Sequence, residues 1–534
     1  MLYKKYFSEH LFYFIGFILL SILFIVNGYA TLDTNDDWAL RNMLMAKGIY
    51  GTLIMCYPLS YIISHLYDFF PLGQWYSILL ASVVAVNFYF ISHYIEEHTS
   101  YIQKFILLIL ALLWITYLWF FMSITTLTIL TIITAIGLIN RNLFLSFIFI
   151  FLSFFLRSDI MLIFIPYYVV AYFILRHTLS FKRREFFTLF SIILIIVLSC
   201  FLQKKDTQYN EWLTFNKARS GIVDMGVAHM DKAHFTKEER YSIHIGWWQD
   251  RELLPTKKVL LTGASLKDIL WHNIENIHLL HFLKTHKFKH WIWLLLLASL
   301  YAMILNRKNK KVFFIPIFVS GVILLILTRD VERVTVPLII LWFYVSYESL
   351  KAYKWTRTLF LLSFTAIFYY YISSQLAYRY FKEVTALQNE ARELIKDSNK
   401  SCEVSIHYPT TYINEINTIF KVNYLFHENN WLQVNETEIL PTGWLSRHKF
   451  FNQTHHISDA YTQRKYKTYH DYLIDDHTAF FGSHKLVKNK AFKILLHAYD
   501  RRYLQDKPTC KHRNFLIAQS KHFGISQIRI ECDK

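Results

Sequence analysis

The apolar stretch LFYFIGFILLSILFIV runs from Leu11 to Val26 and is soon followed by the polar run Thr34-Asn35-Asp36-Asp37-Trp38. An uninterrupted apolar stretch of this length predicts a helix that crosses a membrane. Asp36 and Asp37 are then expected at the bilayer surface, where carboxylates are usually paired, solvated or used. They suit a catalytic base, or ligands of a divalent cation such as Mg²⁺ or Mn²⁺, acting on a lipid-borne substrate. They equally suit the first turn of a surface helix, because carboxylates favour the positive end of the helix dipole.

Composition predicts that the rest of the chain is a polytopic α-helical membrane protein. Of 534 residues, 54% are hydrophobic and 18% are aromatic. The first apolar segment lacks a small-residue cleavage site, so we expect a retained anchor rather than a signal peptide. We predict about eleven transmembrane helices, at 11–29, 74–94, 104–122, 124–140, 143–156, 158–175, 187–202, 289–305, 312–327, 335–350 and 358–374.

The distribution of Lys and Arg predicts the orientation of these helices. With the N-terminus in the cytoplasm, fifteen Lys and Arg residues fall in cytoplasmic turns and five in the short outer turns. If 52–70 were a further span, every later loop would lie on the other side of the membrane, and the basic clusters would be outside. We therefore expect an amphipathic helix from Tyr57 to Phe70 that lies on the outer membrane surface.

This topology divides the chain into two domains. A transmembrane domain covers 1–377, with outer loops at 30–73 and 203–288, and an extracytoplasmic C-terminal domain covers 378–534. The C-terminal domain is expected to be mixed α/β, since its residues alternate like strands near both of its ends and show helical periodicity between them. The expected location is a bacterial inner membrane.

Cysteine usage leaves the covalent structure of the C-terminal domain open. Cys402, Cys510 and Cys532 allow one disulfide and leave one thiol. Pairing Cys510 with Cys532 would close the C-terminal tail. The absence of CxxC and HExxH spacings argues against a dedicated structural zinc site.

The formal net charge of +18 has two interpretations. It can reflect topology and solvation, or it can attract anionic lipid head groups and phosphates. Nucleic acid is not an expected partner, because no nucleic-acid-binding motif accompanies the charge.

Four arginines predicted on the outer side are candidates for phosphate binding: Arg157, Arg219, Arg329 and Arg333. Guanidinium groups hold phosphate oxygens by paired hydrogen bonds and stay charged near a low-dielectric boundary. The alternative is local pairing, for example of Arg157 with Asp159, and of the last two arginines with the acidic residues between them.

The outer loop 203–288 mixes aromatic and polar side chains around Trp247 and Asp250. Aromatic rings stack on the apolar faces of sugars, while carboxylates accept hydrogen bonds from hydroxyls. The alternative is an interfacial aromatic belt, which most membrane proteins have.

Four short runs follow the first span and open the second: Asn35-Asp36-Asp37, Gly48-Ile49-Tyr50-Gly51, Tyr57-Pro58-Leu59 and Trp75-Tyr76. Their layout resembles the GT-C superfamily of membrane glycosyltransferases, including aminoarabinose transferases and protein mannosyltransferases. It is also similar to a group of bacterial polytopic proteins with an Asn-Asp-Asp first loop, at 216–219 and 329–333. The resemblance covers residues 1 to about 375.

The resemblance implies a sugar donor carried on polyprenyl phosphate and a lipid, glycan or protein acceptor. Asp36 or Asp37 would then deprotonate the acceptor, with or without a divalent cation, while Arg329 and Arg333 hold the donor phosphate. Neither the sugar nor the acceptor follows, because the chain has no signature of a known branch. The remaining expected substrate contacts are Tyr57, Arg157, Arg219, Trp247 and Asp250.

Three other functions stay open at this point. A surface-polysaccharide polymerase or ligase would use long outer loops in the same way. A lipid-linked oligosaccharide flippase would need ionisable residues along the spans and inverted repeats. The sequence shows few ionisable residues in the spans and no inverted repeat. A non-catalytic envelope assembly protein would use the outer domain to recruit a partner.

Overall fold

The computed structural model describes about three fifths of the chain. The described residues are 9–27, 31–32, 40–41, 43–45, 51–52, 54–71, 73–98, 100–176, 190–191, 193–198, 201, 203, 207–225, 235–244, 253–261, 337, 340–341, 343–344, 347, 354–380, 390, 393–394, 405–409, 423–424, 433–434, 437–442, 469–476, 478–483, 490–521 and 523–533.

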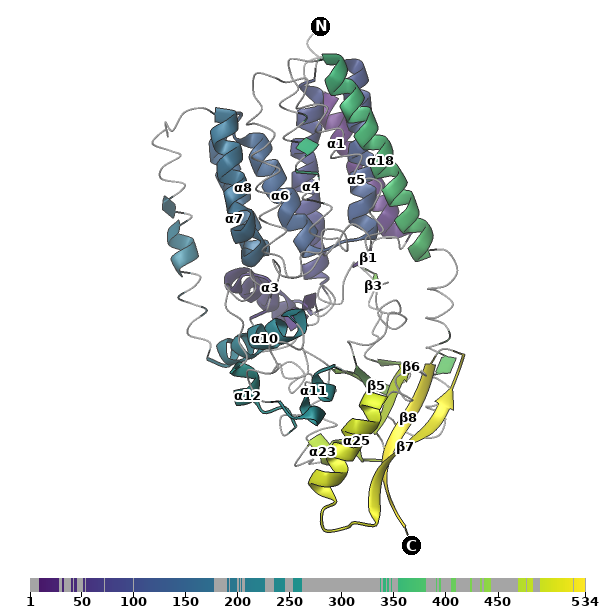
Figure 1. Ribbon diagram of the computed structural model, residues 1–534. Helices are drawn as coiled ribbons and strands as arrows, with labels where there is room; N and C mark the ends of the chain where they lie inside the picture. The colour runs from purple at the N-terminus through teal and green to yellow at the C-terminus, as the bar shows by residue number, and fades with distance from the viewer. Residues whose placement is uncertain are drawn as a thin grey trace.

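Apolar helices packed side by side form a bundle (Figure 1). Polar caps separate consecutive helices: the side chains of Ser123 and Asn142 accept hydrogen bonds from the first backbone N–H groups of α6 and α7. The helices are α1 (Glu9–Val26), α4 (Trp75–Glu96), α5 (Tyr101–Phe120), α6 (Ile124–Leu138), α7 (Leu143–Leu156), α8 (Ser158–Arg176) and α18 (Lys354–Tyr380).

Three of these helices, α1, α4 and α5, are long and apolar enough to cross a membrane. Three shorter apolar helices lie at Ile124–Leu138, Leu143–Leu156 and Ser158–Val169. The prediction of a mostly helical protein with segments long and apolar enough to cross a membrane is confirmed, while the number eleven stays a prediction. The spans predicted at 289–305 and 312–327 lie outside the described residues, and those at 187–202 and 335–350 are described only in part.

The outward-facing side of α1 is apolar, as expected for a surface in contact with lipid. Phe12 is 70% exposed and Val26 is 74% exposed, whereas Phe17 faces the bundle and is 1% exposed. α1 is apolar on all sides, and one of these sides is not packed against the bundle. Such a helix is typical of a membrane span and unusual in a water-soluble fold.

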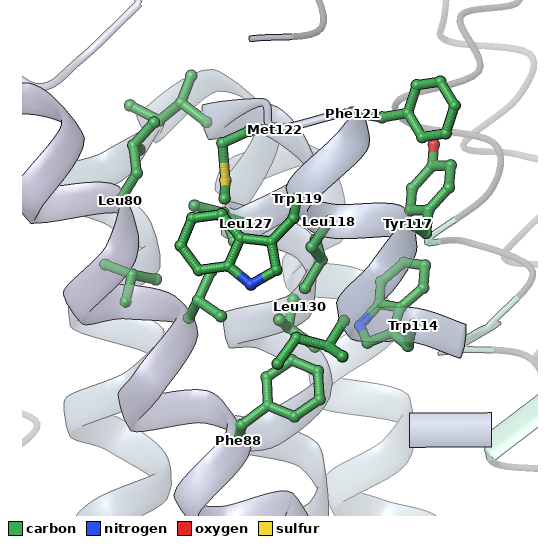
Figure 2. Packing of buried hydrophobic residues seen from close by; sticks show 14 of the residues in the cluster. Leu80, Phe88, Trp114, Tyr117, Leu118, Trp119, Phe121, Met122, Leu127 and Leu130 are labelled. Atoms are coloured by element: carbon green, nitrogen blue, oxygen red, sulfur yellow. The ribbon is translucent and has the colours of Figure 1, made fainter. Parts of the chain in front are cut away.

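The centre of the bundle is an aromatic and aliphatic cluster around Trp119 of α5 (Figure 2). Trp119 is 1% exposed and packs among residues that include Phe88, Met122 and Leu130. Its indole N–H donates to the hydroxyl of Ser21 in α1 at 3.0 Å, which satisfies the polar end of a buried ring. One side chain therefore joins α1 and α5.

A buried polar network joins α4 to α6. The amide of Asn87 donates to the Thr131 hydroxyl at 3.2 Å, and the Thr134 hydroxyl donates to the Asn87 carbonyl oxygen at 2.6 Å. Hydrogen bonds of this kind between apolar helices fix which faces meet, because an unpaired polar group would be costly there.

Four helices outside the bundle lie at one of its ends: α3 (Tyr57–Phe69), α10 (Thr207–Met225), α11 (Lys237–His244) and α12 (Thr256–Leu260). The helix predicted from Tyr57 to Phe70 is present as α3, and it lies across the end of the bundle (Figure 1). Thr236 and Glu239 form a reciprocal capping box at the start of α11. The ammonium group of Lys258 in α12 pairs with Glu239 at 2.6 Å and ties these two short helices together.

The C-terminal part is a six-stranded mixed sheet with the order β4-β5-β2-β6-β8-β7, accompanied by α23 (Tyr469–Leu473) and α25 (Lys490–Tyr503). β2 is parallel to both of its neighbours, and the remaining pairs are antiparallel. The strands are β2 (Ser405–Pro409), β4 (Gln433–Val434), β5 (Thr437–Thr442), β6 (Thr478–Ser483), β7 (Cys510–Gln519) and β8 (Phe523–Cys532).

A disulfide joins Cys510 to Cys532, which are opposite each other in the β7–β8 hairpin. Of the pairings that the sequence left open, this one closes the C-terminal tail. Cys402 lies outside the described residues.

The first loop, the second long loop and the C-terminal sheet meet at the same end of the bundle (Figure 1). β1 (Thr31–Leu32), directly after α1, pairs antiparallel with β3 (Asn423–Tyr424). Arg501 of α25 donates to Glu238 of α11, and this hydrogen bond lowers the pKa of the Glu238 carboxyl. Leu253 of the second loop packs into the hydrophobic cluster formed by α23 and α25.

Candidate functional site

Arg157 lies at this end of the bundle, in the break between α7 and α8. Its Nε donates to the Asp159 carboxylate at 3.0 Å, and its Nη1 donates to the hydroxyl of Thr125 near the start of α6. The side chain is 15% exposed. The local pairing that the sequence allowed is thus present, and Thr125 is a further partner that sequence reasoning missed. The two partners hold the guanidinium group in one orientation at the bundle end.

The start of α3 is attached directly beside this arginine. The backbone N–H of Cys56 donates to the carbonyl of Phe155, the residue two positions before Arg157, at 3.0 Å. This bond holds Tyr57, the first residue of α3, next to the end of α7. The structure therefore brings two of the predicted site residues, Tyr57 and Arg157, to the same place.

α10 reaches the same place through Tyr209. The phenol of Tyr209 donates to the backbone carbonyl of Thr52 at 2.6 Å, and its ring lies 5.8 Å from that of Tyr57. A Cβ atom at Gly51 would lie 2.4 Å from the Tyr209 ring, so only glycine allows this approach. Sequence reasoning did not find Tyr209, although Gly51 in the run Gly48-Ile49-Tyr50-Gly51 was a signal that something packs closely there.

Arg219 lies elsewhere on α10 and is held locally. It follows Tyr209 by ten residues, about 15 Å along the helix axis. Its side chain is 7% exposed, and its Nε donates to the Asn216 amide oxygen at 2.7 Å. The neighbouring Phe215 and Ala218 belong to the small core that α10 shares with α11 and α12. This setting suits an arginine that supports the loop, and its contact with substrate stays a prediction.

Six predicted site residues lie outside the described part of the chain: Asp36, Asp37, Trp247, Asp250, Arg329 and Arg333. The described neighbours of the acidic pair are nevertheless informative. β1 precedes it and pairs with β3, while Leu40 and Arg41 after it are 1% and 4% exposed. The acidic pair is therefore flanked on both sides by residues that are packed against the rest of the protein. The predicted divalent cation stays a prediction.

A different group of possible metal ligands lies at the opposite end of the bundle. Nδ1 of His10 in α1 donates to Glu96 of α4 at 2.8 Å, and Nδ1 of His93 is 3.6 Å from the same carboxylate oxygen. The three ligand atoms lie within 4.8 Å of one another. The spacing His93-x-x-Glu96 places both side chains on one helix face, so the sequence could have revealed two of the three members of this group. Its present hydrogen bond joins α1 to α4.

The C-terminal sheet contains a buried histidine pair. His512 of β7 donates through Nδ1 to Asp500 of α25 at 2.8 Å, and its Nε2 lies 2.8 Å from Nε2 of His470 in α23. His470 is also stacked on Tyr503, with ring centroids 3.8 Å apart. Burial lowers the pKa of His512, and the Asp500 carboxylate opposes this effect. With its proton on Nδ1, neutral His512 accepts at Nε2 the hydrogen bond that Nε2–H of His470 donates, so the neutral form satisfies both ring nitrogens.

This histidine predicts a pH dependence of stability. A lowered pKa in the folded state means that stability is complete above the unfolded value near 6.5 and is lost as pH falls below it. Each unit between the two pKa values contributes about 1.4 kcal/mol. We expect the protection factors of amides in β7 and β8 of the full chain to fall between pH 7 and pH 5. They are obtained from hydrogen exchange followed by mass spectrometry, as the intrinsic exchange rate at each pH divided by the observed rate.

The protection factors of the His512→Gln variant should fall less than those of the parent over this pH range. His65→Gln is the control, because it removes a histidine on α3, outside the C-terminal sheet. Equal pH profiles for parent and His512→Gln would contradict the assignment.

No protein-family model, curated protein or solved structure matches this chain. Its class therefore follows from the fold itself: a predominantly helical protein whose described residues include three helices long and apolar enough to cross a membrane. At one end of the bundle, the start of α3 with Tyr57 lies beside the end of α7 that precedes Arg157, and Tyr209 of α10 contacts the same segment.

Proposed function

We propose that this chain is a membrane glycosyltransferase of the GT-C type. It transfers a sugar from a polyprenyl-phosphate-linked donor to a lipid, glycan or protein acceptor on the outer face of the inner membrane. Asp36 or Asp37 acts as the base toward the acceptor, and arginines of the outer loops bind the donor phosphate.

The observation that carries the proposal is the meeting of distant segments at one end of the bundle. The strand β1 before the acidic pair, the start of α3, Arg157 and Tyr209 all lie at this end. A lipid-linked donor needs such a place, where its chain stays in the bilayer while its phosphate and sugar reach polar side chains. Protein binding sites are commonly assembled in this way, from loops positioned by a rigid scaffold.

Two further observations support an outer location for this end. The disulfide between Cys510 and Cys532 lies in the C-terminal sheet, and disulfides persist in oxidising compartments outside the cytoplasm. The basic residues Lys104, Arg141 and Lys354 lie at the end of the bundle opposite Arg157. The positive-inside rule places such residues on the cytoplasmic side.

Arg157 is the described residue with the clearest role under this proposal. Asp159 and Thr125 orient its guanidinium group at the bundle end. A donor phosphate that displaced the Asp159 carboxylate would gain a charge-assisted hydrogen bond without reorienting the arginine. Tyr57, at the start of α3 beside the end of α7, offers an aromatic ring at the same end of the bundle.

The test compares envelope glycans and lipids by mass spectrometry in the parent strain, a deletion strain and a complemented strain. We expect the deletion to remove one defined sugar increment and to accumulate the sugar-charged polyprenyl phosphate, with complementation reversing both. Accumulation of a complete lipid-linked oligosaccharide would indicate a flippase instead. An unchanged profile would contradict the proposal.

A further inference from the structure

A cavity of about 140 Å³ lies inside the bundle, away from the site described above. It is enclosed by α4, α5, α6 and α18 together with residues between 340 and 347. Its walls are almost entirely apolar, with Leu110, Ala111, Ile133 and Phe368 among them. The Thr134 hydroxyl in the wall already donates to Asn87. Water does not fill a cavity of this character, so its natural occupant is apolar.

The cavity is elongated along the helices and ends at the N-terminal end of the bundle. Its lining on α6 extends from Leu130 to Leu138, about 12 Å along the axis. Tyr94 and Ile95, at the end of α4, border the same space. Its lining thus extends from the middle of the bundle to the end opposite Arg157, a length that accommodates a segment of a hydrocarbon chain lying parallel to the helices.

Two arginines lie where the cavity meets this end. Arg141 is the charged residue among the described lining residues, and its guanidinium group lies 4.9 Å from the centre of the Tyr94 ring. It also pairs with Glu97. Arg357 is 8% exposed and lies 3.9 Å from the centre of the ring of Tyr347, which also lines the cavity. An apolar channel with arginines at one end complements an amphipathic anion.

We propose that this cavity binds one acyl chain of an anionic glycerophospholipid, with the lipid phosphate at Arg141 and the charge of Arg357 behind Tyr347. Basic pockets between membrane helices on the cytoplasmic side commonly recognise anionic head groups in this way. The site goes beyond the proposed sugar transfer. It lies at the other end of the bundle from the candidate donor site, so a resident membrane lipid rather than the polyprenyl donor fits its position.

Native mass spectrometry of the delipidated, detergent-purified full chain tests this site. The probes are dioleoyl phosphatidylglycerol, dioleoyl phosphatidylcholine and undecaprenyl phosphate, titrated separately. We expect the anionic phospholipid to bind about fivefold more tightly than the zwitterionic one, and Arg141→Gln to remove about this factor. Arg513→Gln in the C-terminal sheet removes the same charge far from the cavity and should change nothing.

Filling the cavity gives the second readout. Ala111→Phe should reduce retained phosphatidylglycerol at least about tenfold, as expected when the buried chain loses its place. Ile133→Phe, on the opposite wall, is measured if the first variant does not fold. Val86→Phe is the matched control, because Val86 is 43% exposed on the outside of α4.

Equal binding of both phospholipids, unaffected by Ala111→Phe, would mean that only surrounding bilayer lipid is detected and would overturn the proposal. Tighter binding of undecaprenyl phosphate that Ala111→Phe abolishes would assign the cavity to a polyprenyl chain and overturn it as well. Neither result depends on sugar transfer, so the glycan and lipid profiles of the deletion strain test the proposed function independently.

Discussion

Replacing Asp36 or Asp37 with asparagine is expected to lower the rate of sugar transfer by about 10²–10⁴-fold, the usual contribution of a general base. Asparagine keeps the size of the side chain and removes its ability to accept a proton, so folding should be little affected. The two variants separate the aspartates, because only the base should show the full effect. The measurement is transfer by the purified chain from a polyprenyl-phosphate sugar donor, with membrane insertion checked for each variant.

Asp68→Asn is the matched control for these variants. Asp68 is a half-buried carboxylate on α3, in the same first loop, and has no expected role in transfer. Its substitution should leave the rate within about twofold, as for most surface changes. Unchanged transfer in both Asp36→Asn and Asp37→Asn would remove the carboxylates from the mechanism. Sugar transfer would then depend on another base.

Replacing Trp119 with alanine should lower the free energy of unfolding by about 3 kcal/mol, near the lower end of the range for large-to-small changes in soluble cores. In a membrane the unfolded helices stay in lipid, so the transfer term is small and the loss of van der Waals packing dominates. Trp119 is 1% exposed at the centre of the cluster in Figure 2, and its hydrogen bond to Ser21 is lost too. Unfolding in mixed detergent micelles, followed by circular dichroism, measures the effect.

Two variants separate packing from the hydrogen bond. Trp119→Phe keeps most of the ring contacts and loses the bond to Ser21, so it should cost about 1 kcal/mol. Phe105→Ala on the same helix is the control, because Phe105 is 64% exposed, and its effect should stay within about 0.5 kcal/mol. Equal losses for Trp119→Ala and Phe105→Ala would show that Figure 2 does not depict the stabilising core.

Local patterns predicted the described helices well. The apolar segment 124–140 is found as Ile124–Leu138, and the amphipathic helix predicted from Tyr57 to Phe70 is found as Tyr57–Phe69. The strand-like alternation predicted near the end of the C-terminal domain is found as β8. These elements follow from apolar length, periodicity and caps, which act between near neighbours in the chain.

The candidate site was predictable only in part. Arg157 was selected for its charge and its place between two spans, and its pairing with Asp159 needed only a two-residue spacing. The Thr125 partner and the approach of Tyr209 to Gly51 join residues that are distant in the sequence, and no local pattern specifies such pairs. For the same reason, no pattern pointed to the His470–His512 pair or to the apolar cavity.

The sequence by itself determined that this is a predominantly helical protein with segments able to cross a membrane, since composition and run length decide how a chain partitions between water and lipid. Only the tertiary structure decided which cysteines pair, which loops meet beside Arg157 and where a space is left between α4, α5, α6 and α18. Those outcomes depend on how side chains from distant segments fill a common volume, and packing of that kind is a property of the assembled fold.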